Sequence, residues 1–104
     1  MTLGSLVAVW SHTLVRNDYW PTPHPSRRPL DLHALPRLGA RLAITITRAD
    51  VERLVAALRA EGRLSIATIN RVLATLKRVL EFGVRNGHLP NNPALYIRPL
   101  PRPA

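Results

Sequence analysis

The sequence contains no cysteine, a single lysine and few acidic residues. Without cysteine it can form neither disulfides nor thiolate metal sites, which fits a reducing cytoplasm. No apolar run approaches the roughly 20 residues that a membrane-spanning helix needs. The opening "MTLGSLVAVW" also lacks the basic region of a signal peptide. These absences predict a soluble, cytoplasmic protein with no membrane segment.

Aromatic residues are also scarce, at 5% of the chain, whereas hydrophobic residues reach 46%. A hydrophobic core must therefore be built from leucine, valine, isoleucine and alanine, and this composition favours helices over a β-sandwich. The length of 104 residues suits one compact domain. We expect an all-α fold, a small bundle of about four helices.

The shortage of acids leaves a strongly basic chain. Fifteen lysines and arginines face 6 aspartates and glutamates, so the formal net charge is +9. Guanidinium groups match phosphate oxygens bidentately, so an arginine excess indicates an anionic partner. A high-GC genome would also favour arginine over lysine. It would not explain the shortage of acids.

The first half of the chain predicts one helix, a loop and a shorter helix. Apolar residues at helical spacing predict a helix from Leu3 to about Asn17, with Thr2 as its N-cap and Trp10 in the core. Four prolines between positions 21 and 29 exclude a continuous helix there. A short helix is expected over 30–38, followed by a turn and a brief extended connection over 37–47.

The second half predicts two well-delimited helices. Thr47 should cap the first, with Asp50 at the favoured acidic position and Gly62 closing it. Ser65 should cap a longer helix that ends at Gly87, in which Gly83 allows close packing. The residues expected to be buried on the two helices are Val51, Leu54, Val55 and Leu58, then Ile66, Ile69, Val72, Leu73, Leu76, Val79, Leu80 and Val84.

The polar side of the long helix carries most of the functional signal. A helical wheel places Thr68, Arg71, Thr75, Arg78 and Arg85 on one stripe, with Asn70, Ala74 and Lys77 beside it and Glu81 as the one interrupting acid. Asparagine can pair with adenine, arginine with guanine, and threonine and lysine with phosphate. Most charged stripes are simply solvated, but this one lacks the acids that solvated helices use for pairing.

No constellation of catalytic residues stands out. The histidines (His12, His24, His33 and His88) are scattered and show no metal-ligand spacing, and His24 and His88 are expected to be exposed. Tyr19 and Tyr96 lack activating neighbours, so both are expected to pack, as is Trp20. There is no glycine-rich phosphate loop and no paired carboxylate. We therefore expect no enzymatic activity, no cofactor and no metal.

Two segments, "ITITRADVERLVAAL" and "LSIATINRVLATLKRVLEFGVRNGHLPNNPA", resemble the core-binding, SAM-like N-terminal domain of tyrosine recombinases, the phage integrase family. The matching elements are Ile46-Thr47, Asp50-Val51, Ser65, Thr68-Ile69-Asn70-Arg71, Leu76-Lys77, Gly87 and Asn92-Pro93. The resemblance covers about residues 30–99. Gly83 stands where the family usually has alanine, and the region before Pro29 matches weakly.

The resemblance implies a core-binding domain over residues 1–97 that clamps duplex DNA, followed by a tail or interdomain linker over 98–104. The catalytic domain, with its arginines, histidine and tyrosine, is absent from this chain. Partners would be double-stranded DNA and a recombinase catalytic domain, and an oligomer on DNA is compatible with this role. Face geometry and the resemblance together suggest these DNA-binding residues: Arg48, Thr68, Asn70, Arg71, Ala74, Lys77 and Arg78.

A second hypothesis is a helical protein–protein interaction module whose basic face binds an acidic partner. An enzyme with a concealed site is a third hypothesis, and no cluster of residues supports it. Binding of random duplex DNA at moderate salt would separate the first two, because only the first predicts it.

Overall fold

The structure, a computed structural model, describes residues 1–18 and 27–101. The expectations for Tyr19, Trp20, His24 and most of the proline-rich loop lie outside these residues. In chain order the elements are α1 (Leu3–Asp18), the π-helical turn η2 (Leu30–Ala34), α2 (Leu35–Leu38), the 3-10 turn η3 (Ala43–Thr45), α3 (Arg48–Glu61) and α4 (Ile66–Arg85). The described residues contain no strand and only an isolated bridge between Thr2 and Leu42. The all-α prediction is confirmed.

Helix α1 begins and ends close to where its sequence predicts. The Ser5 backbone N–H donates to Thr2 Oγ1 at 3.1 Å, so Thr2 acts as the N-cap. The apolar face buries Leu3, Leu6, Val7 and Trp10. The helix continues to Asp18, one residue past the expected end.

The expected short helix over 30–38 consists of two pieces, η2 and α2. Pro36 explains part of this irregularity, because proline has no N–H to donate to the carbonyl four residues earlier. The connection that follows was expected to be a turn with an extended stretch. It contains η3, flanked by extended backbone at Leu42 and Ile46.

The caps of α3 form as predicted. Thr47 and Asp50 make a reciprocal capping box, and Gly62 ends the helix in the left-handed region at φ 68°. The carboxylate of Asp50 accepts from the Thr47 backbone N–H at 2.9 Å and from Arg41 and Arg53 at 2.9 and 2.7 Å. These contacts join the start of α3 to the preceding connection.

Helix α4 also starts as predicted, with the Thr68 N–H donating to Ser65 Oγ at 3.1 Å. It ends at Arg85, two residues before the expected end, because Gly87 at φ 78° already belongs to the C-terminal turn. A Cβ at Gly83 would lie 2.9 Å from Leu89 Cδ1 and 3.1 Å from Leu6 Cδ2. Gly83 therefore permits a close approach, both by α1 and by the chain after α4.

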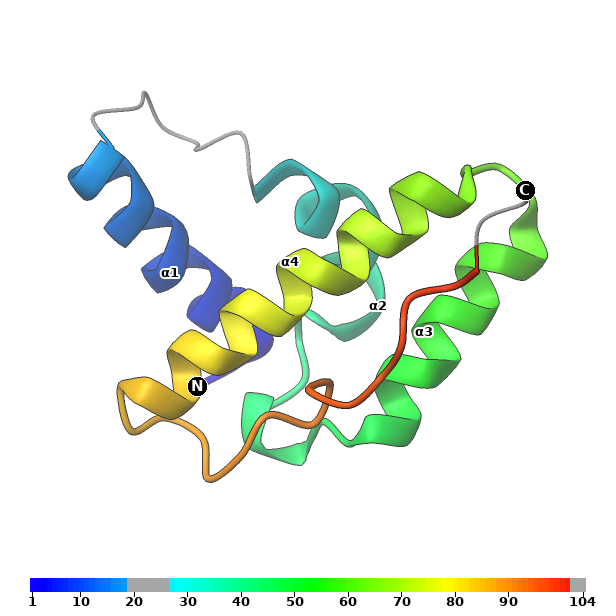
Figure 1. The fold of residues 1–104 in the computed structure, drawn as a ribbon. Helices are drawn as coiled ribbons and strands as arrows, with labels where there is room; N and C mark the ends of the chain where they lie inside the picture. Colours follow the sequence, from blue (N-terminus) through cyan, green and yellow to red (C-terminus); the bar gives the residue numbers. More distant parts are fainter. Residues whose placement is uncertain (19–26, 102–104) are drawn as a thin grey trace.

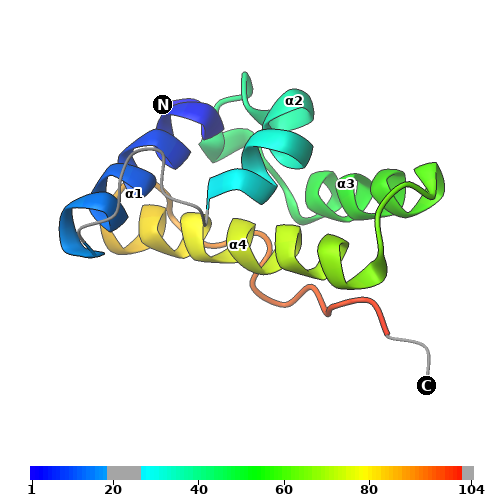
Figure 2. The same cartoon turned by 90° about the horizontal axis from the view of Figure 1, so that it is seen from above.

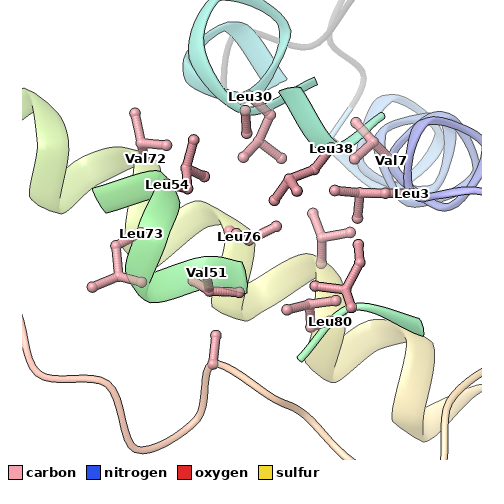
Figure 3. Packing of buried hydrophobic residues seen from close by; sticks show 14 of the residues in the cluster. Leu3, Val7, Leu30, Leu38, Val51, Leu54, Val72, Leu73, Leu76 and Leu80 are labelled. Atoms are coloured by element: carbon pink, nitrogen blue, oxygen red, sulfur yellow. The ribbon is translucent and has the colours of Figure 1, made fainter. Parts of the chain in front are cut away.

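The elements pack as a layer of short helices over α4. Helix α1 lies over the C-terminal half of α4 and α3 over its N-terminal half, with η2 and α2 between them (Figure 2). Leucines and valines from all of these elements meet at the centre (Figure 3). No helix in the described ranges has both the length and the apolar character needed to cross a membrane. The fully buried larger side chains are Leu3, Leu6, Leu30, Ile69, Leu73, Leu76, Leu80, Val7, Val51, Val72 and Val79.

After α4 the chain reverses direction. The N–H groups of His88 and Leu89 both donate to the Gly83 carbonyl, at 2.8 and 3.2 Å. The segment that follows runs back along α4 toward its N-terminal end, ending on the side of the molecule where α3 and α4 are joined (Figure 1). This return places the C-terminal residues beside the polar face of α4.

Candidate nucleic-acid interface

One side of α4 and the start of η2 together line an open groove of about 550 Å³. Helix α4 forms one wall along about three of its turns, and η2 with the two residues before it forms the other. The opposite face of α4 is buried in the core, which holds this wall in place. The lining residues are Arg28, Pro29, Leu32 and His33 on one side, and Thr68, Arg71, Ala74, Thr75 and Arg78 on the other.

Arg71 and Arg78 are the main cations of the groove. Both are exposed, and neither forms an ion pair with any residue described by the structure. Ala74 lies between them on the same wall and is exposed. Its side chain is a single methyl group, the smallest on this wall.

The two threonines of the wall differ in accessibility. Thr68 is half-buried and its hydroxyl lies 3.0 Å from Ser65 Oγ. Thr75, which the helical wheel places on the same polar stripe, is buried, and its hydroxyl donates to the Arg71 carbonyl at 2.8 Å. Thr75 therefore belongs to the floor of the groove.

Arg28 and His33 line the groove but were not among the residues predicted to bind DNA. Arg28 is exposed, and like Arg71 it pairs with none of the carboxylates whose side chains the structure describes. Neighbouring Arg27 differs, because it pairs with Asp31 and donates to Ser11 Oγ. The sequence pattern gave no signal for Arg28, since its proximity to α4 depends on how two distant segments pack.

The described ion pairs leave the arginines of this groove without a carboxylate partner. Every carboxylate that the structure describes in side-chain detail pairs with arginine: Asp31 with Arg27, Asp50 with Arg41 and Arg53, Glu52 with Arg48, Glu61 with Arg37, and Glu81 with Arg85. Glu81, expected to interrupt the basic stripe, is thus itself paired at 3.6 Å. The groove cations keep their full charge.

Asn70 and Lys77 do not line the groove, and both contact the C-terminal segment. The Asn70 amide accepts from the Leu100 N–H at 2.7 Å and donates to the Leu100 carbonyl at 3.0 Å. Lys77 Nζ donates to the Ile97 carbonyl. Asn70 would have to release Leu100 before it could read a base, and Lys77 would have to release Ile97 before it could bind a phosphate.

Arg48 lies at the start of α3 and does not line the groove. It forms an exposed ion pair with Glu52 at 2.8 Å. Exposed pairs of this kind contribute about 0–1 kcal/mol, so the guanidinium could exchange Glu52 for a phosphate at little cost. The seven residues predicted to bind DNA therefore fall into three groups. Four line the groove (Thr68, Arg71, Ala74 and Arg78), two contact the C-terminal segment (Asn70 and Lys77), and Arg48 lies apart from both.

The aromatic and histidine expectations have mixed outcomes. Trp10 is buried and His88 is exposed, as predicted. The packing expected for Tyr96 is wrong, because 78% of its surface is exposed. Tyr96 sits in the returning segment, which contacts α4 through its neighbours Ala94 and Ile97.

Comparison with known proteins identifies the fold. No family model and no curated protein matches the sequence. Among solved structures, the integrase-like domain from Bacillus cereus superimposes with a TM-score of 0.82 and 22% identity, over 98% of this chain and 85% of that domain. The phage integrase SAM-like domain from Moorella thermoacetica gives a TM-score of 0.70 and 24% identity, over 93% of this chain and 86% of that one. This chain has the fold of a phage integrase SAM-like domain.

Proposed function

We propose that this chain is the DNA-binding core-binding module of a site-specific tyrosine recombinase. It would hold duplex DNA through the groove beside α4 and cut no strand itself, since strand cleavage would belong to a separate catalytic domain. Its location would be the cytoplasm. The observation that carries the proposal is that Arg28, Arg71 and Arg78 converge on one groove with no carboxylate partner among the described residues.

The geometry supports a duplex as the ligand. A guanidinium group binds phosphate or the guanine edge bidentately, and an exposed helix face can enter the major groove. Arg71 and Arg78 lie seven residues apart, which on a helix is roughly 10 Å. Ala74 between them would let the backbone of α4 approach the DNA closely. Thr68, at the N-terminal end of the wall, would add a phosphate contact.

Salt dependence tests the proposal directly. If three to five phosphates are neutralised, the logarithm of the association constant should fall with log salt at a slope of roughly −3 to −4.5. Arg71→Ala combined with Arg78→Ala should make that slope shallower by about 2. Fluorescence anisotropy of a labelled random duplex over a range of NaCl concentrations measures both.

A matched control separates the groove from net charge alone. Arg59→Ala combined with Arg63→Ala removes the same charge from exposed positions at the end of α3 and just after it. The control should weaken binding slightly and leave the slope within about 0.5 of the original. If the salt slope became shallower by the same amount in both double variants, the groove would not be the DNA-binding surface.

An apolar hollow favours the second hypothesis, a protein partner. Trp10, Leu14, Phe82 and Leu95 line it, together with three cations, Lys77, Arg78 and Arg85, and one acid, Glu81. This surface would suit an acidic amphipathic segment. No binding to any duplex at 50 mM salt, where a basic DNA-binding module binds even random sequence at roughly micromolar affinity or better, would make that hypothesis the stronger one.

A further inference from the structure

The returning segment Ala94–Pro101, called the strap below, is held against α4 at several points. Ala94 and Ile97 are buried, and Leu100 packs partly buried against the core. Arg98 and Pro99, between the two anchoring residues, are exposed. The buried side chains of the strap therefore recur at every third position, and its first part is a turn in which the Ile97 N–H donates to the Ala94 carbonyl at 3.1 Å.

The strongest anchor is the pairing of Asn70 with Leu100. A carboxamide side chain has the same donor and acceptor as a peptide group, so it can satisfy one residue's N–H and C=O together. Asn70 does this at 2.7 and 3.0 Å. Leu100 lies between Pro99 and Pro101, which have no N–H of their own. Its N–H is the one backbone donor in that stretch, and Asn70 receives it.

The second anchor, Lys77 on the Ile97 carbonyl, is in register with the first. Seven residues of helix from Asn70 to Lys77 rise about 10.5 Å. Three residues of extended chain from Ile97 to Leu100 span about 10 Å. The two anchors on α4 thus match two positions on an antiparallel extended peptide.

A third contact fixes where the strap begins. The Asn92 side chain donates to the Lys77 carbonyl at 3.1 Å and accepts from the Ala94 N–H at 3.0 Å. The amide thereby links the helix backbone to the first residue of the strap.

We propose that Asn70 and Lys77 are positioning residues that dock the chain's own strap, and that neither of them contacts DNA. The docked strap sets the path by which the chain leaves α4 and marks one border of the basic face. Arg71 and Arg78 line the groove and make no hydrogen bond to the strap. The docking itself is independent of the proposed DNA binding.

Amide hydrogen exchange at Leu100 tests the docking. In the original chain the Leu100 N–H should exchange more slowly than its intrinsic rate, while the Arg98 N–H, which has no acceptor within the described residues, should exchange freely. Asn70→Ala should speed up Leu100 exchange by roughly threefold to tenfold, the effect of losing one hydrogen bond. The Leu76 N–H in the core of α4 should stay protected, which separates loss of the anchor from loss of the fold.

Asn86→Ala is the matched control, because Asn86 is the asparagine that caps the C-terminal end of α4 and its side chain donates to the Phe82 carbonyl instead of the strap. It should leave Leu100 exchange unchanged. Unchanged Leu100 exchange in Asn70→Ala would overturn the docking role of Asn70.

Lys77→Met and Arg78→Met, adjacent on α4, test the second half of the proposal. Arg78→Met should make the salt slope of duplex binding shallower by about 1, and Lys77→Met should leave it unchanged. If both variants changed the salt slope equally, Lys77 would contact DNA, and its assignment as a strap-docking residue alone would be wrong. If the chain binds no duplex, the recombinase proposal fails while the exchange experiment still decides whether the strap is docked.

Discussion

At the scale of single residues, Asp50 accepts more hydrogen bonds than any other carboxylate whose side chain the structure describes. Its pKa is held well below the ordinary value, first by the Thr47 backbone N–H and then by Arg41 and Arg53. A carboxyl whose pKa is lower in the folded state stabilises the fold at pH values above its unfolded pKa of about 4. That contribution is lost as the pH falls toward the folded-state pKa.

We therefore expect Asp50→Asn to lower the free energy of unfolding at pH 7. The difference in the free energy of unfolding between this variant and the original chain should shrink as the pH falls from about 4 to about 2. Urea denaturation at a series of pH values measures it. Glu52→Gln, which removes an exposed acid of the same helix, should cost less than about 1 kcal/mol at pH 7. If the difference in the free energy of unfolding for Asp50→Asn stayed constant down to pH 2, the negative charge of Asp50 would not be what stabilises the fold.

The single-residue scale is also where sequence reasoning was least complete. The polarity of Asn70 and Lys77 was visible in the sequence, but their partners lie 30 and 20 residues away along the chain. No local pattern encodes such contacts. The same holds for Arg28, which reaches the groove only because η2 packs on α4.

At the scale of elements, helix ends were predicted well because caps are local. Thr47, Gly62 and Ser65 each take the role that their residue type favours at a helix terminus. The short pieces were harder. The π-helical turn over Leu30–Ala34 and the 3-10 turn over Ala43–Thr45 arise from packing around Pro36 and from the tie between Thr2 and Leu42.

Ser65 offers a test at this scale. Ser65→Ala removes the acceptor for the Thr68 N–H and should lower stability by about 1 kcal/mol. Ser65→Asp keeps an acceptor and places a negative charge at the helix N-terminus, so it should be close to neutral. Urea denaturation at pH 7 compares the two. Equal losses in both variants would indicate that side-chain packing, and not capping, is the contribution of Ser65.

At the scale of the whole molecule, the net charge of +9 opposes folding through self-repulsion. The described acids are already paired, so the remaining arginines and the lysine repel one another. The screening length falls from about 30 Å at 0.01 M salt to about 8 Å at 0.15 M. Added salt should therefore reduce the repulsion more than it weakens the exposed ion pairs.

We expect the melting temperature to rise when NaCl is increased from 10 to 150 mM, as followed by circular dichroism. Arg59→Gln combined with Arg63→Gln removes two exposed cations and should reduce this rise. A melting temperature that falls with salt would mean that the arginine–carboxylate pairs outweigh the repulsion.

The matched spacing of the two strap anchors restricts how this chain can change length. Surface segments usually tolerate insertions, because an added residue can bulge into solvent. Between Ile97 and Leu100 an added residue would shift Leu100 by about 3.3 Å relative to Asn70, so one anchor would have to detach. Other loops could differ in length among relatives of this chain, while the number of residues between the positions of Ile97 and Leu100 would have to stay constant.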